Sequence, residues 1–225
     1  MCIVLLTTAH PSYALIVIDN RDEFILRPTS RPHWWSHPAG PTARGEVYGL
    51  SNTSYLDPDA WPKVEDGKRL VREAVEQAVA EDLDEEALTE KLFGVLDTDT
   101  LPAPRPGQGF AEYIPQLKHS IFIPSIGDEH HRQAMVEATK RGKGEWDTDD
   151  KMAAEQLQRP DATSGENGIG FDTGMYGTQR QSVILVDWDG NVVFKERALW
   201  DSNGNPIPKG EGDVVFKYKI DGWDD

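Results

Sequence analysis

The chain has a single cysteine, few basic residues and no long apolar run. Cys2 alone cannot form an internal disulfide, and so little cysteine fits a reducing compartment. The 23 lysines and arginines are outnumbered by 39 aspartates and glutamates, and the net charge of −16 argues against a nucleic acid or an anionic membrane surface as the main partner. No segment approaches the roughly 20 apolar residues of a membrane-spanning helix, and Asp19 and Asn20 end the first apolar stretch too early for a secretory signal. We therefore expect a soluble, cytoplasmic protein with no integral membrane segment.

A length of 225 residues and an apolar content of 38% suffice for one domain, which we place at residues 1–225. Within it, residues 141–170 are charged, dotted with glycine and poor in apolar side chains, so we expect a mobile charged excursion there. The repeated prolines of residues 27–45 exclude a regular helix or a central strand and predict a loop.

Apolar periodicity predicts a sheet and two helices. Alternating or continuous apolar runs predict strands at residues 2–8, 13–19, 47–50, 182–187, 192–197 and 214–220. Apolar residues at helical spacing predict one helix at residues 63–81 and a second that is capped by Asp82 or Asp84 and ends at Gly94. Residues 120–124 are a further candidate strand. The strand pattern predicts a mixed, mainly antiparallel sheet with the helices on one of its faces.

The first strand contains the one candidate site with a complete mechanism. Aminopeptidases usually remove Met1 before a small residue, which would leave a free amine and a thiol together on Cys2. The amine could then accept the thiol proton near neutral pH. Arg21 could lower the pKa of the thiol, Asp22 could orient the ammonium, and Asn52 at a strand end could hold an oxyanion. The alternative is that Cys2 is a small buried hydrophobe and that the polar residues form ordinary turns.

Histidines provide two weaker candidates. His33 and His37 flank Trp34-Trp35 and could ligate a metal or haem iron beside an aromatic wall. Since no cysteine or carboxylate completes a metal set there, we favour tryptophans that cover the core and histidines that face water, with no metal site. His130 and His131 are neighbours in a polar, helical run, where adjacent side chains cannot face one ligand, and we expect a solvated surface.

Four blocks of sequence point to a family. They are Met1-Cys2-Ile3; Asn20-Arg21-Asp22-Glu23-Phe24 with Arg27-Pro28; Tyr48-Gly49-Leu50-Ser51-Asn52; and Tyr176-Gly177-Thr178-Gln179-Arg180 running through Val186-Asp187 to Glu196-Arg197. In order and character these blocks resemble the NRDE-motif proteins, the transport and Golgi organisation 2 family. The resemblance implies an α+β fold like that of the N-terminal-nucleophile hydrolases, a sandwich of two β-sheets between helical layers (αββα).

The chain departs from the family between Phe24 and Val47. Related sequences carry a long block there, with a Gly-Thr-Trp-Leu-Gly motif and a strand that ends in Leu-Thr-Asn, and this sequence has neither motif. The block would supply several strands and an oxyanion-holding asparagine. We therefore expect an incomplete fold, in which one face of the remaining sheet is open and unusually apolar.

The resemblance implies an intracellular factor in Golgi organisation, protein secretion and haem trafficking, with a Golgi or mitochondrial association added to the cytoplasmic location. It implies no bound cofactor, haem as a candidate cargo and a small-molecule ligand of unknown identity. The first alternative is a cysteine N-terminal-nucleophile amidohydrolase that acts on C–N amide bonds, in which Cys2, Arg21, Asp22, Asn52 and Arg180 occupy the catalytic positions by resemblance. The second is a nonfunctional truncated isoform or gene-model product.

Overall fold

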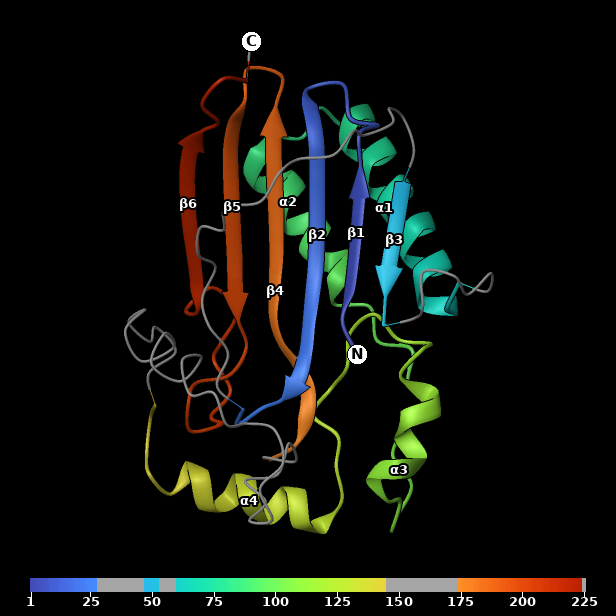
Figure 1. The fold of residues 1–225 in the computed structure, drawn as a ribbon, viewed down its shortest axis with the longest axis vertical. Coiled ribbons are helices and arrows are strands. Elements are labelled where there is room, and N and C mark those ends of the chain that lie inside the picture. Colours follow the sequence, from blue (N-terminus) through green and yellow to red (C-terminus); the bar gives the residue numbers. More distant parts are fainter. Residues whose placement is uncertain (28–46, 53–59, 145–173, 224–225) are drawn as a thin grey trace.

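The described part of the chain is built on one antiparallel β-sheet (Figure 1). The structure is a computed structural model, and it describes residues 1–27, 47–52, 60–144 and 174–223. Within these ranges the strands are β1 (Ile3–Thr7), β2 (Tyr13–Phe24), β3 (Val47–Ser51), β4 (Tyr176–Asp187), β5 (Asn191–Ala198) and β6 (Asp213–Lys219). Their order across the sheet is β3-β1-β2-β4-β5-β6, and each neighbouring pair is antiparallel. The predicted α+β class is confirmed, and so are the six strands predicted at the two ends of the sequence and around residue 48.

The two central strands come from opposite ends of the sequence. β2 pairs with β4 along its whole length, with Ile18 opposite Val183 and Arg21 opposite Arg180. A register shift follows Arg21, so that Asp22 lies opposite Thr178. Both strands are longer than predicted, since β2 continues past Asp19 to Phe24 and β4 starts at Tyr176. The Asn-Arg-Asp-Glu motif therefore lies inside the sheet and not in a turn beyond it.

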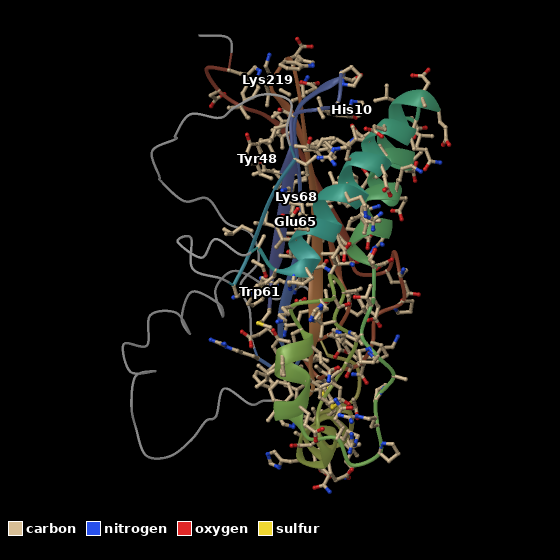
Figure 2. The ribbon with its side chains drawn as sticks, turned by 90° about the vertical axis from the view of Figure 1, so that its right-hand side faces the viewer. His10, Tyr48, Trp61, Glu65, Lys68 and Lys219 are labelled. Carbon is tan, nitrogen blue, oxygen red and sulfur yellow. The ribbon has the colours of Figure 1, made fainter. Side chains whose placement is uncertain are left out.

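Helices α1 (Pro62–Ala80) and α2 (Glu85–Leu96) cover one face of the sheet, as Figure 2 shows edge-on. Pro62 occupies the first helical position, where its missing N–H costs nothing, and the side chain of Asp84 caps α2 by accepting a 2.8 Å hydrogen bond from the Ala87 N–H. The apolar stripes of both helices pack against the inward side chains of β1, β2 and β4 in the larger core. Both predicted helices are confirmed, and α2 extends past Gly94 to Leu96.

The opposite face of the sheet carries exposed apolar side chains. On β3, the inward Val47 is buried, whereas Tyr48 and Leu50, which alternate with the inward positions, are exposed. On β6, Lys217 reaches Glu85 of α2, so that Phe216 and Tyr218 point to the other side. These four apolar residues are 38–54% exposed, and no helix of the described residues lies over them. This arrangement agrees with the predicted apolar face.

A second, smaller core lies beyond the end of β2. It is closed by α3 (Phe110–Tyr113), the short helix η1 (Ile114–Gln116) and α4 (Glu129–Thr139), which lie below the sheet in Figure 1. Its buried members are Phe24, Tyr113, Leu117, Ile123, Ile126 and Tyr176. Most of the excursion predicted at 141–170 lies outside the described residues.

Two local predictions were wrong in this region. Residues 120–124 form no strand: Ile121 and Ile123 are buried anchors of a loop, and the Ser120 hydroxyl bonds the Phe122 carbonyl at 2.6 Å. His131 is not on a solvated surface, because its ring is 5% exposed and stacks on Phe24 with a centroid separation of 6.0 Å. The ring turns inward because Asp128 caps α4 and holds its Nδ1 at 2.6 Å.

Gly67 sets the distance between α1 and the sheet. A Cβ atom at this position would lie 2.7 Å from Cδ1 of Leu5. We expect Gly67→Val to lower the free energy of unfolding by about 1–3 kcal/mol, because the extra carbons would force α1 away from β1. Gly94 is the matched control, since nothing lies within 4 Å of its Cβ position, and Gly94→Ala should raise stability by about 0.5–1 kcal/mol. Urea unfolding measures both, and an unchanged Gly67→Val midpoint would contradict the close packing.

Candidate N-terminal site

The N-terminal amine lies against a buried carboxylate where β1 meets the end of β2. The Met1 ammonium is 3.4 Å from Oδ2 of Asp22, whose side chain is fully buried, and it also donates a hydrogen bond to the Tyr176 hydroxyl. The Thr178 hydroxyl donates to the other oxygen, Oδ1, of Asp22 at 2.7 Å. Burial raises the pKa of the Asp22 carboxyl, and the charges of the amine and of Lys63 oppose that rise.

Lys63 is the residue that the sequence reasoning missed. Its side chain is fully buried, and its Nζ donates a hydrogen bond to the Met1 carbonyl oxygen and lies 4.0 Å from Oδ2 of Asp22. Burial lowers the pKa of this ammonium, and Asp22 opposes the change. A cation in the first turn of a helix is also disfavoured by the helix dipole, so its position requires these two oxygen partners. The sequence did indicate that Lys63 is buried, because Lys63, Gly67 and Val71 are spaced four residues apart and so lie on the buried stripe of α1.

Cys2 lies at the rim of this cluster. Its side chain is partly exposed, and the thiol donates a long hydrogen bond of 3.7 Å to the Asp22 carbonyl oxygen. The Cys2 carbonyl oxygen accepts a 2.6 Å bond from the Ser51 hydroxyl, which ties β1 to the end of β3. Asn52 follows Ser51 directly and is exposed. In the described chain the amine belongs to Met1 and the thiol to Cys2, so the predicted pairing on one residue requires removal of Met1. We call Met1, Cys2, Asp22, Lys63 and Tyr176 the N-terminal cluster.

Arg21 and Arg180 lie next to each other on the central strands. They are directly opposite in the β2–β4 register, and Nη1 of Arg180 forms a 2.9 Å ion pair with Oε1 of Glu196. Burial lowers the pKa of the Arg21 guanidinium, with the Glu196 charge opposing and the Arg180 charge reinforcing the change. The structure thus brings Cys2, Arg21, Asp22 and Arg180 to one end of the sheet. Asn20 is structural, because its amide donates to the Leu96 and Ile121 carbonyls at 2.8 and 3.0 Å.

Asp19 should make stability depend on pH. Burial raises its pKa from 3.8 to about 6, while a Ser182 hydrogen bond and the Arg21 charge oppose the rise. A raised carboxyl pKa favours folding below pH 3.8, and that contribution is lost as the pH rises through about 6. We therefore expect the stability of Asp19→Asn relative to the parent to rise by about 2 kcal/mol between pH 4 and pH 7. Urea unfolding at both pH values measures it. The exposed Asp66→Asn should show a change within about 0.5 kcal/mol, and a flat Asp19→Asn difference would contradict the assignment.

Other candidate features give little support for a metal or a membrane span. His33, His37, Trp34 and Trp35 lie outside the described residues. Among the residues that the structure does describe, no group of three or more histidines, cysteines or carboxylates is placed to bind a metal ion. In the same part of the chain, no helix combines the length and the apolar character needed to cross a membrane.

The geometry defines an α+β protein with a thiol and buried charges gathered at the N-terminal end of one antiparallel sheet. The chain belongs to the Transport and Golgi organisation 2 family, whose sequence model matches residues 1–42 and 38–201. The Bos taurus Transport and Golgi organization protein 2 homolog is 31% identical over 157 residues, which are 70% of this chain and 40% of that protein. An uncharacterized protein of Saccharomyces cerevisiae is 56% identical over 34 residues, 15% of this chain and 11% of its own length. The chain thus spans less than half the length of the relatives that it matches.

Proposed function

We propose that this chain is a non-catalytic factor in transport and Golgi organisation that binds a small molecule at the N-terminal cluster. Family membership carries the proposal, together with the name of the bovine relative, Transport and Golgi organization protein 2 homolog. Roles in protein secretion and haem trafficking, and a cytoplasmic location with Golgi or mitochondrial association, belong to the same proposal. So does an incomplete N-terminal-nucleophile-hydrolase-like fold, whose second sheet would cover the apolar face that Tyr48, Leu50, Phe216 and Tyr218 expose.

A complementation experiment tests this function. In the cells that encode the chain, its deletion should slow the secretion of a reporter protein and alter Golgi morphology, and re-expression should reverse both. Cys2→Ala should restore secretion as well as the parent does, because the proposed factor needs no nucleophile. Asp22→Ala should restore it poorly, because the N-terminal cluster loses its carboxylate. Failure of the parent chain itself would overturn the proposal and favour a nonfunctional truncated product.

The second candidate is a cysteine amidohydrolase, and the position of Cys2 beside the N-terminal amine and Asp22 favours it. With Met1 removed, the Cys2 amine would accept the thiol proton, and the thiolate would attack the amide carbonyl carbon. A C–S bond forms, the C–N bond breaks, and the proton passes to the leaving nitrogen. Water then cleaves the thioester, which releases the acid and restores the thiol. Asp22 would orient the amine, Arg21 and Arg180 would contribute positive charge near the thiol, and Asn52 would donate to the oxyanion.

Covalent labelling tests the hydrolase. A peptide-like electrophile should modify Cys2 of the chain without Met1 faster than it modifies free cysteine, and intact-protein mass spectrometry follows the reaction. The chain that retains Met1 is the control, because its amine is on the wrong residue. Cys2→Ser should take up no label, since Cys2 is the only cysteine. Equal rates for the two forms and for free cysteine would rule out an activated nucleophile.

Haem binding should be weak or absent in this chain. A haem site needs a closed apolar cavity, and the block that the family carries between the Asn-Arg-Asp-Glu and Tyr-Gly-Leu-Ser-Asn motifs would supply walls that this sequence lacks. A haem titration followed at the Soret band should therefore give a shallow, non-stoichiometric change. A sharp stoichiometric change that disappears in His33→Ala or His37→Ala would contradict this expectation and make haem a specific cargo.

A further inference from the structure

Met1 is bound by the fold in the way that a protein binds an aminoacyl ligand. Its ammonium contacts the Asp22 carboxylate at 3.4 Å and the Tyr176 hydroxyl. Its carbonyl oxygen accepts a hydrogen bond from the Lys63 ammonium. Its side chain packs against the second core, as Leu101 and Phe110 also do. The ammonium, the carbonyl oxygen and the side chain of Met1 therefore each have a complementary surrounding, which β2, β4, α1 and the second core provide.

The polar partners are built into the fold and are not surface contacts. The side chains of Asp22 and Lys63 are fully buried, and Tyr176 is 8% exposed. Burying two opposite charges costs several kcal/mol each unless other groups satisfy them, and their mutual distance of 4.0 Å is too long for a hydrogen bond. Met1 lies between the two charges: its ammonium is 3.4 Å from Oδ2 of Asp22, an ion-pair distance, and its carbonyl oxygen accepts a hydrogen bond from Lys63. The cluster is thus complementary to a group that carries both an ammonium and a carbonyl oxygen.

We propose that, once Met1 is removed, this cluster is the subsite that holds the aminoacyl part of the substrate. The ligand class is an α-amino acid amide with a free ammonium and an apolar, unbranched side chain of about the size of methionine. This inference rests on the proposed amidohydrolase function and names its substrate class. A ligand that takes the place of Met1 would lie against the freed Cys2 amine, on the residue that carries the thiol, with its carbonyl oxygen directed at Lys63. Lys63 is then a second donor to the developing oxyanion, in a chain that lacks one asparagine of the family pattern.

Binding can be tested without turnover. The full-length Cys2→Ser chain from which Met1 has been removed, verified by intact mass, should bind L-methioninamide saturably in a calorimetric titration. N-acetyl-L-methioninamide should bind at least about ten-fold more weakly, because it lacks the ammonium that Asp22 and Tyr176 recognise. The Cys2→Ser chain that retains Met1 should show no binding, because its own first residue fills the subsite.

Two variants separate recognition from folding. Tyr176→Phe should weaken L-methioninamide binding about ten-fold through the loss of one hydrogen bond to a charged group. Tyr13→Phe, at the other end of β2, should change binding less than about two-fold, and the unfolding temperatures of both variants establish that they are folded. Equal binding of the free and acetylated amides, equal binding with and without Met1, or no binding at all would overturn the subsite. If the Cys2→Ser chain binds L-methioninamide but the electrophile does not label Cys2, the ligand site stands and the hydrolase function is excluded. If the electrophile labels Cys2 but L-methioninamide does not bind, the activated nucleophile stands and the aminoacyl subsite is excluded.

Discussion

Glu196→Ala should lower the free energy of unfolding by about 3–5 kcal/mol, because it leaves a buried guanidinium without its carboxylate. The pair with Arg180 has an N–O distance of 2.9 Å, and the two side chains are 10% and 4% exposed. Arg21 already lies directly across from Arg180 on β2, so the variant would also remove the negative charge that offsets two adjacent guanidinium groups. Urea unfolding at pH 7 measures the loss.

Two further variants make the Glu196 prediction specific. Glu73→Ala removes an ion pair with Arg69 of the same 2.9 Å length, but both side chains are more than half exposed, and the loss should stay within about 0.5 kcal/mol. The double variant Arg180→Met with Glu196→Leu should recover at least half of the lost stability, since it removes both buried charges. A Glu196→Ala loss below about 1 kcal/mol would mean that water or other groups screen the pair.

Phe93→Ala should cost about 3–5 kcal/mol, because it opens a cavity where α2 meets the sheet. The ring is 1% exposed, and the guanidinium carbon of Arg197 lies 4.0 Å from its centroid. Lys195 lies over the same ring at 5.5 Å, so the aromatic face also stabilises two cations of β5. Thermal and urea unfolding of the variant measure the combined loss.

A second substitution divides the Phe93 effect into its parts. Phe93→Leu keeps most of the apolar volume and loses the aromatic face, so we expect a loss of about 1–1.5 kcal/mol. Val79→Ala, at a position that is 44% exposed on α1, should change stability by no more than about 0.5 kcal/mol. If Phe93→Leu were as damaging as Phe93→Ala, the contact with Arg197 and Lys195 would dominate over packing.

Local sequence patterns were sufficient to locate the strands and both long helices. Asp84 could be identified as a cap, and the stripe from Val64 to Ala78 as the buried face of α1, because capping and periodicity depend on residues close in sequence. The family motifs, and not apolar periodicity, indicated which residues belong to one site, namely Cys2, Arg21, Asp22 and Arg180. Apolar periodicity locates strands and helices but does not show which polar residues meet.

The missed features depend on contacts between distant segments. Lys63 is buried where Met1, which precedes β1, supplies its carbonyl oxygen and β2 supplies Asp22, and no residue near Lys63 in the sequence indicates either partner. His131 is buried because Phe24 and Phe110 come from other elements. β2 extends through its polar motif because β4 offers backbone partners there, a tertiary effect that overrides weak strand propensity.

The pairing of β2 with β4 also determines when the sheet can form. The middle of the sheet joins a strand that begins at Tyr13 to one that begins at Tyr176, so most of the polypeptide must leave the ribosome before the two can meet. Closing so long a loop slows folding, since its entropic cost precedes any stabilising contact. Until then the β1–β2 hairpin has an unpaired apolar edge, which makes the nascent chain prone to aggregation and a natural client of chaperones that hold unfolded polypeptides.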